Sequence, residues 1–272
     1  YVCLLTTVPL LFVCIVEYYS SKSAIEQRVI EQLTSIADLK KSELNSWLEE
    51  RLTDISVIVR NKVLAAAATS LLQQRRRCES VYQLMNSETA RINYNRVLEN
   101  LHALKQFYKH YNVISIIDGA NGEVVISTYP DLVGKTLSSF NSYIDVLNNQ
   151  DVAVKDVYTS ELMGQNWMTY YCPVLMTDTL TLESSDVIVG VILLDVNVNN
   201  SVNPFIHSWP GMGKTSQTLL VRREGDNIVY LNDLRHKQGA ALKFTSPIRS
   251  TLDIPSVLSS RGEEGIKESK DY

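Results

Sequence analysis

The stretch from Ser20 to Ala66 decides the fold, and it reads SSKSAIEQRVIEQLTSIADLKKSELNSWLEERLTDISVIVRNKVLAA. Its apolar residues recur at steps of three and four, the spacing of one face of an α-helix. They are Ile25, Val29, Leu33, Ile36, Leu44, Trp47 or Leu48, Leu52, Ile55, Val59 and Val63. Because the stretch has no Gly or Pro, we expect one uninterrupted helix of about 70 Å. A helix longer than a small domain predicts an elongated protein that can pass displacement along its axis.

An uncharged apolar segment, Val2–Val16, precedes this helix. A full membrane span takes about 20 apolar residues, and the core of a signal peptide is also of similar length. The interfacial pattern of Glu17, Tyr18 and Tyr19 and the lack of a cleavage site favour a retained span. We therefore expect residues 1–19 to form a truncated transmembrane segment, and the chain to be a fragment cut at both ends.

The composition excludes some classes of function. A net charge of -4 over 272 residues offers no basic face for nucleic acid. The cysteines contain no C-x-x-C, so unpaired thiols are the simplest interpretation, although Cys78 and Cys172 could pair. The four histidines have no metal-binding spacing, and no G-x-S-x-G is present. We expect no metal, no cofactor and no enzymatic activity.

After the long helix the period of the sequence changes twice. A second amphipathic helix is predicted from Val81 to His110, with a buried stripe that includes Tyr94, Val97, Leu98, Leu101, Leu104, Phe107, Tyr108 and Tyr111. Arg75–Arg77, between the helices, read as a solvated loop or helix end. From Asn112 onward β-branched runs predict an antiparallel meander, with strands at 113–117, 123–128, 152–158, 167–175 and 187–198 and a short helix at 143–147.

A smaller β unit is predicted at the C-terminal end. A short helix at 199–209 leads to Gly211–Thr215, which resembles a phosphate loop but has Ser208 where that motif needs Gly, so a connector is the better interpretation. A hairpin of 218–222 with 227–231 and a strand at 242–247 follow. Helices followed by an antiparallel sheet make an α+β protein.

The order of these stretches resembles the double Cache (dCache) sensor domains of prokaryotic membrane receptors. The first hairpin, Asp118–Thr128, the second, Val157–Val174, and the closing strand Gly190–Asp195 carry the resemblance. It implies an N-terminal transmembrane helix (1–19), a long membrane-to-distal signalling helix (20–80), a membrane-distal module with an antiparallel PAS-like sheet (81–200), and an incomplete membrane-proximal Cache module (201–272).

The resemblance also implies a function. It predicts an extracytoplasmic, small-molecule sensing region anchored in the cell membrane, most like those of sensor histidine kinases in two-component systems. Diguanylate cyclases and chemoreceptors are the alternative outputs. Dimerisation through the long helix is a further implication. An ectodomain that binds a partner without a small ligand, and an extracytoplasmic enzyme, remain competing hypotheses.

Asp195 is the best candidate for a ligand-binding residue. It ends a nearly apolar strand, where an unpaired carboxylate is costly, although a solvated strand end or a helix cap would explain it too. The resemblance adds that receptors of this family that bind amines use an Asp at this place for the ammonium group. Those receptors also carry an Arg and a Trp-Tyr pair shortly after a Tyr; here Tyr158 is present, but Met163 stands in place of the Arg and Gln165 in place of the Trp. The resemblance therefore argues against an α-amino acid ligand.

Aromatic residues near Asp195 complete the predicted site. Trp167, Thr169 and Tyr171 alternate along one strand and share one face, opposite Met168, Tyr170 and Cys172. One face packs on the helices, and the other can line a pocket for which aromatic rings with polar groups are suited. An ordinary core role is an equally good interpretation of each. Tyr129 and Tyr158 are expected to cap the pocket.

Overall fold

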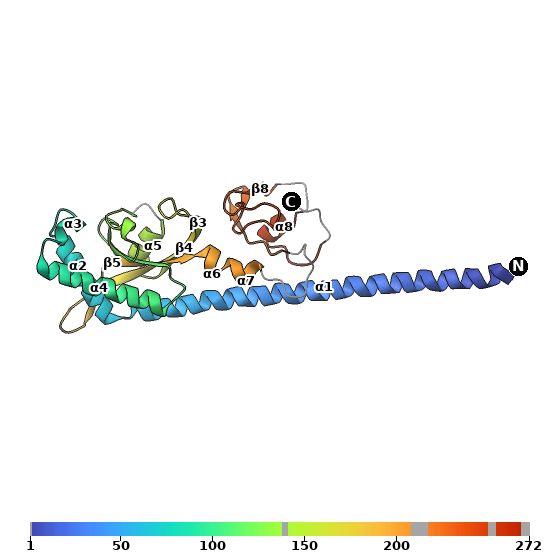
Figure 1. Cartoon of the computed structure of the whole chain (residues 1–272), viewed down its shortest axis with the longest axis horizontal. Helices are drawn as coiled ribbons and strands as arrows, with labels where there is room; N and C mark the ends of the chain where they lie inside the picture. The colour runs from blue at the N-terminus through green and yellow to red at the C-terminus, as the bar shows by residue number, and fades with distance from the viewer. Residues whose placement is uncertain (1, 138–140, 208–216, 250–253, 268–272) are drawn as a thin grey trace.

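The computed structural model describes residues 2–137, 141–207, 217–249 and 254–267, which extend along one helix (Figure 1). This helix, α1 (Val2–Val59), has 58 residues and is about 87 Å long at 1.5 Å per residue. Its N-terminal half projects beyond both β modules (Figure 1). The predicted long helix therefore exists, and it is continuous with the apolar N-terminal segment.

The prediction of an uninterrupted helix up to Ala66 is wrong at one point. α1 ends at Val59, and α2 (Lys62–Arg75) starts after a 64° bend. The side chain of Asn61 accepts a hydrogen bond of 3.1 Å from the Leu64 N–H. A side-chain N-cap starts a new helix without Gly or Pro, so breaker residues alone could not locate this bend. Leu52 and Val63, predicted to be buried, are mostly exposed.

The predicted helix from Val81 to His110 is also divided. The structure has α3 (Val81–Leu84) and α4 (Glu88–Phe107), with Ser87 as the N-cap of the second. Val97 and Leu101 are buried as predicted, whereas Phe107 is 79% exposed. The stripe prediction is therefore correct in the middle of α4 and wrong at its last residue.

Five antiparallel strands form the main sheet, which confirms the α+β class. They are β1 (Val113–Asp118), β2 (Val124–Ser127), β3 (Ala153–Thr159), β4 (Asn166–Thr177) and β5 (Ser184–Asn197), in the spatial order β2-β1-β5-β4-β3. The sheet is not a simple meander, because β5 lies between β1 and β4. A 3-10 turn η1 (Pro130–Leu132) and α5 (Asn141–Asn149) interrupt the chain between β2 and β3.

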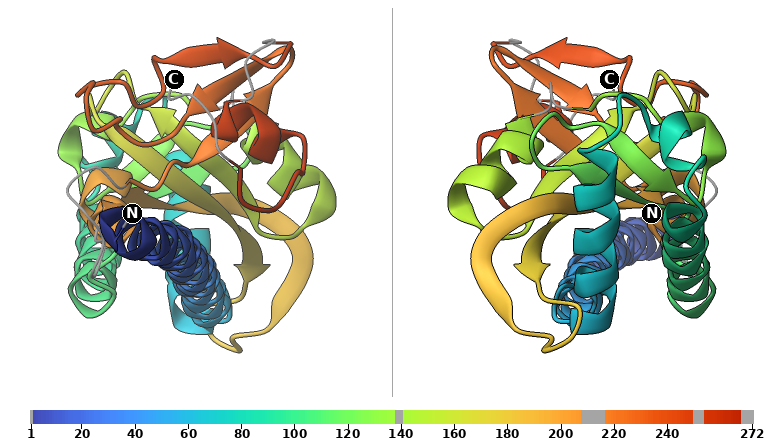
Figure 2. Two further views of the ribbon diagram at one scale, coloured as in Figure 1. Left: turned by 90° about the vertical axis from the view of Figure 1, so that its right-hand side faces the viewer. Right: turned by 90° about the vertical axis from the view of Figure 1, so that its left-hand side faces the viewer.

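The two faces of the sheet bury different cores. The helices α1, α2 and α4 gather on one face (Figure 2), where Tyr170 and Cys172 join the larger core. The opposite face carries a second core, in which Trp167 and Tyr171 of β4 pack with Tyr143 of α5. Cys172 is a buried free thiol and Cys78 a half-buried one. The face covered by α5 is thus the face on which the predicted ligand-binding residues of β4 lie.

A smaller module follows the main sheet. The short helices α6 (Val198–Ser201) and α7 (Asn203–His207) lead toward β6 (Val221–Glu224), β7 (Asn227–Tyr230) and β8 (Thr245–Pro247), ordered β6-β7-β8, and α8 (Pro255–Ser260). The predicted hairpin around Gly225 is confirmed. The predicted connector Gly211–Thr215 lies outside the described residues. Leu220, Leu231 and Leu242 pack against the larger core, so the two modules share an apolar contact.

Candidate functional site

Three polar side chains form a row across the sheet face opposite to α1, α2 and α4. The antiparallel register pairs Lys155 of β3 with Thr169 of β4, and Thr169 with Asp195 of β5. Residues directly opposite one another on antiparallel strands project to the same side. The row therefore brings together residues that are up to 40 positions apart in the sequence.

Two hydroxyl groups form a relay that ends on the Asp195 carboxylate. Thr169 Oγ1 donates to Asp195 Oδ1 at 2.5 Å, and the Tyr158 hydroxyl lies 2.9 Å from Thr169 Oγ1. Because the one hydroxyl hydrogen of Thr169 points to Asp195, Tyr158 must be the donor in the second bond. The relay holds the carboxylate in place in a position that is only 3% exposed.

Burial shifts the pKa values of Asp195 and Lys155 in opposite directions. It raises the pKa of Asp195 to about 6, against the hydrogen bond from Thr169 and the charge of Lys155, which both lower it. It lowers the pKa of Lys155 to about 8, against the charge of Asp195. The Lys155 ammonium lies 3.7 Å from the centroid of the Tyr158 ring. Opposite shifts in one buried cluster are typical of functional sites.

The predicted aromatic residues flank this row on the same face. Trp167 and Tyr171 are buried, at 6% and 1% exposure. The indole N–H of Trp167 is buried without a hydrogen-bond partner among the described residues. A buried donor without an acceptor costs about 1–3 kcal/mol, so this group invites an acceptor from outside the chain.

The structure does not gather every predicted site residue. Tyr129 lies at the start of η1, is 36% exposed, and follows β2, which β1 separates from β5. Lys155 was not predicted from the sequence. Met163 packs against the ligand-face core, and the Gln165 side chain accepts a hydrogen bond from Asn197. The structure therefore gathers five residues, which we call the Asp195 cluster: Asp195, Thr169, Tyr158, Lys155 and Trp167.

The centre of this cluster is buried, whereas Lys155 and Tyr158 at its edge are half-buried. A cavity of about 730 Å³ lies elsewhere, between α2 and the turn that joins β4 to β5, where Thr69, Gln73 and Asp178 line it. Asp195, Thr169 and Trp167 are each less than one-tenth exposed. The Asp195 carboxylate is therefore buried on the face of the sheet that α5 covers.

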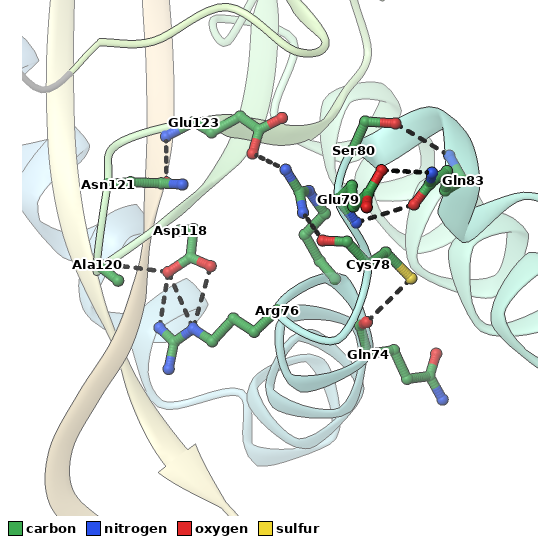
Figure 3. Close-up of polar contacts among 11 residues, drawn as sticks. Gln74, Arg76, Cys78, Glu79, Ser80, Gln83, Asp118, Ala120, Asn121 and Glu123 are labelled. Carbon is green, nitrogen blue, oxygen red and sulfur yellow. Dashed lines mark hydrogen bonds and ion pairs between the residues drawn. The ribbon is translucent and has the colours of Figure 1, made fainter.

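Two of the three arginines at the end of α2 connect the helices to the sheet (Figure 3). Arg76 forms an ion pair of 2.7 Å with Asp118, and Arg75 one of 2.5 Å with Glu123. The prediction of a helix end is confirmed, but these two side chains are not merely solvated. The Tyr143 hydroxyl of α5 donates to the Gly119 carbonyl in the same turn at 2.9 Å. The turn after β1 therefore touches both α2 and α5.

No group of three or more His, Cys, Asp and Glu side chains in the part of the chain that the structure describes could hold a metal ion. Among the described residues no single helix is long and apolar enough to cross a membrane, although Leu10–Val59 and Lys62–Arg75, bent by 64°, have together the length and composition of a broken span.

A long helix packed on one face of an antiparallel sheet, with a buried acid on the other face, defines an α+β module. The chain belongs to the Cache domain family (dCache_1), whose model matches residues 21–271. Cache domains are extracytoplasmic sensing modules of membrane receptors. No curated protein matches the sequence.

Several solved structures are similar to the chain. The sensor domain of the histidine kinase DctB from Vibrio cholerae is 12% identical, with a TM-score of 0.46 over 77% of this chain and 88% of that one. The ligand-binding domain of the Pseudomonas fluorescens chemoreceptor CtaA, in complex with L-isoleucine, is 14% identical, with a TM-score of 0.48 over 86% and 83%. That of the Pseudomonas aeruginosa chemoreceptor PctC, in complex with GABA, is 16% identical, with a TM-score of 0.42 over 66% of each chain.

Proposed function

We propose that the chain is the sensing region of a membrane-bound sensor histidine kinase, and that it binds a small organic amine at Asp195. The observation that carries the proposal is the buried Asp195 carboxylate, which the relay from Tyr158 and Thr169 orients beside the unpartnered Trp167 N–H. A buried carboxylate is favourable only with a charge partner. An ammonium ligand would supply that partner and take over the compensation that Lys155 provides from its end of the row.

The same residues limit the class of ligand. The Trp167 N–H favours an amine that also carries a hydrogen-bond acceptor, and the rings of Tyr158 and Tyr171 favour one with an apolar body. No arginine is available at Met163 or Gln165 to bind a carboxylate in a bidentate way. We therefore do not expect α-amino acids to be ligands. The site residues are Asp195, Thr169, Tyr158, Trp167 and Tyr171, with Tyr129 outside this cluster.

We infer that residues 1–19 anchor the sensor in the cell membrane. Leu10, Phe12 and Val16 are at least half exposed on the part of α1 that projects past both modules (Figure 1). Glu17 and the aromatic pair Tyr18–Tyr19 follow them, as at a membrane interface. We also infer a homodimer, because Ile25 and Val29 remain exposed on one stripe of the same helix. The sensing modules would then lie outside the cytoplasm.

A route for signalling follows from the buried position of Asp195. We expect ligand entry to displace β3 or α5, and α5 touches through Tyr143 the turn that Arg76 holds against α2. The ligand would shift the balance between closed and open arrangements only by its difference in affinity for the two. The long helix α1 would carry the change toward the membrane.

A ligand screen tests the proposal. We would follow thermal unfolding of the chain from Ser20 onward with amines, polyols, dicarboxylates and α-amino acids. An amine at 100 times its Kd should stabilise the protein by about 2.7 kcal/mol. The effect should vanish in Asp195→Asn and persist in Asp186→Asn, which changes an exposed residue of the same strand. Binding that survives Asp195→Asn would contradict the proposed site.

A partner-binding ectodomain is the second candidate. The burial of Asp195, Thr169 and Trp167 favours it, and so does Leu180, which is 91% exposed between β4 and β5. No response to any metabolite in the screen would support this candidate, whereas turnover of a compound would support an enzyme. A diguanylate cyclase or a chemoreceptor is the alternative to a histidine kinase as the receptor that the sensing region serves.

A further inference from the structure

The edge strand β3 carries a bulge at the point where it reaches the candidate site. Lys155 pairs with Thr169 and Tyr158 pairs with Trp167, so two residues of β3, Asp156 and Val157, lie opposite the single residue Met168. Residues three apart in a regular strand point to opposite faces. The extra residue corrects this, and both Lys155 and Tyr158 reach the face that holds Asp195.

Arg222 of the smaller module forms hydrogen bonds to both residues of this bulge. Its Nη1 lies 3.0 Å from Asp156 Oδ2 and 2.9 Å from the Val157 carbonyl oxygen. Its Nε and Nη2 bond to Glu224 at 3.0 and 2.6 Å, which fixes the plane of the guanidinium group. The Val157 N–H bonds to the Asp156 carboxylate at 2.7 Å. The two residues outside the ladder are thus held by Asp156 itself and by one arginine from the other module.

We propose that Arg222 is a positioning residue for the ligand site: by holding the bulge at Asp156 and Val157, it keeps Lys155 and Tyr158 on the face of Asp195. The inference rests on the proposal that the Asp195 cluster is the ligand site. A slip of one residue in an edge strand moves side chains to the other face, and a bulge without its partner is free to slip. Through the same contact, a movement of β3 on ligand binding in the larger module would also move Arg222 of the smaller module.

The geometry separates Arg222 from a general adhesive role. The modules also share the packing of Leu220, Leu231 and Leu242 against the larger core, so Arg222 is not their only contact. The next residue, Arg223, bonds only to the Gly225 carbonyl of its own hairpin, at 3.3 Å, among the contacts of the described residues. Arg223→Gln is therefore a matched control for Arg222→Gln, with the same loss of charge on the same strand.

The test measures the position of Lys155 without any ligand. Reductive methylation with formaldehyde, followed by peptide mass spectrometry over a range of pH, gives the midpoint at which the Lys155 amine becomes reactive. This midpoint should lie near pH 8 in the unchanged protein. In Arg222→Gln the freed lysine should become solvated and titrate about one unit higher or more, a roughly fivefold loss of reactivity at pH 8. Arg223→Gln should leave the midpoint unchanged.

Every result bears on the proposal. An unchanged Lys155 midpoint in a folded Arg222→Gln protein, or an equal shift in Arg223→Gln, would overturn it. Arg222→Lys keeps a charge but loses the planar grip, and we expect an intermediate shift. Should Arg222→Gln fail to fold, Arg222→Lys decides, since an unchanged midpoint in it also overturns the proposal. The Lys155 measurement uses no ligand, whereas the ligand screen measures amine binding in the protein with Arg222 unchanged. Failure of the Arg222 proposal is therefore distinct from failure of the proposed amine binding.

Discussion

The carboxyl group of Asp195 lowers the stability of the folded chain at neutral pH. Its pKa in the folded state, about 6, lies above the ordinary value of 3.8 because it is buried. A raised acid pKa contributes stability that is fully present below the ordinary value and is lost as the pH rises through 6. We therefore expect Asp195→Asn to raise the free energy of unfolding at pH 7.5 by on the order of 2 kcal/mol. Denaturant unfolding measures the change.

The control for this prediction is the dependence on pH. At pH 4 the carboxyl group is largely protonated in the folded state, so the gain from Asp195→Asn should nearly disappear. Asp186→Asn on the exposed end of β5 should change stability little at either pH. A variant that gains stability and loses amine binding would mark Asp195 as a group kept for function at a cost. A loss of stability at pH 7.5 would contradict the assigned burial cost.

Sequence reasoning found part of this site for a clear physical reason. Strand alternation placed Trp167, Thr169 and Tyr171 on one face, and the structure confirms that shared face. Lys155 was missed because the bulge after it changes the alternation of β3, and no residue type announces a bulge here. The relay from Tyr158 to Thr169 also depends on which strands are neighbours, and this order is a property of the whole sheet.

Among the elements, the turn after β1 holds α2 against the sheet. The Asp118 side chain is buried, and Arg76 is the charged group that bonds to both of its oxygens, at 2.7–3.2 Å. Arg76→Ala leaves this carboxylate with the Ala120 N–H at 2.8 Å. We expect a loss of about 2–3 kcal/mol in the free energy of unfolding, because a buried charge loses its partner.

The neighbouring arginine provides the comparison. Arg77 is exposed, so Arg77→Ala should lie within about 0.5 kcal/mol of the unchanged protein. If Arg76 also couples α5 to α2, Arg76→Ala should increase hydrogen exchange of the Gly119 region and of α5 together, since Tyr143 bonds to that turn. Equal effects of the two alanine variants would contradict a structural role for the Arg76–Asp118 pair.

The strand β5 approaches α2 closely at Gly190. A Cβ on Gly190 would lie 2.5 Å from Leu72 Cδ1 and 2.7 Å from the Ile117 carbonyl oxygen. Gly190→Ala should therefore cost about 2–3 kcal/mol, because the backbone oxygen cannot give way. In the double variant with Leu72→Ala, the total cost should be smaller than the sum of the single costs. Strictly additive costs would show that the helix does not press on this glycine.

Element boundaries were predictable where periodicity was strong and failed where single side chains act. The strands β1, β2 and β3 lie within two residues of their predicted limits, because β-branched runs and the turn at Asp118–Gly122 define them. The break at Asn61 and the one at Ser87 escaped, since each depends on one capping side chain in a polar sequence. The central position of β5 escaped too, because strand pairing is not encoded in local period.

The long helix α1 runs from the larger module to the proposed membrane anchor. Its distal end packs under the sheet, with Ile55 and Ile58 buried, and its other end projects past the smaller module (Figure 1). The 3.6-residue period predicted this helix, but it did not predict which part the modules would cover. Ile25 and Val29 belong to the predicted apolar stripe and are 62% and 44% exposed. An apolar stripe on a helix is normally buried, and a second copy of α1 is the partner that the proposed dimer supplies.

The mass of the chain in solution tests whether a second copy of α1 covers this stripe. Sedimentation of the chain from Ser20 onward should show a concentration-dependent approach to twice the monomer mass, since burying apolar residues on both helices favours association. Ile25→Asp with Val29→Asp should keep it monomeric, because two charges would enter each apolar contact. Ser23→Asp with Gln27→Asp adds the same charge to exposed positions on the other side of the helix, and it should leave the association nearly unchanged. Were both double variants equally monomeric, net charge rather than the stripe would govern association. A monomer at every concentration of the unchanged protein would mean that α1 passes its displacement to the membrane as a single rod.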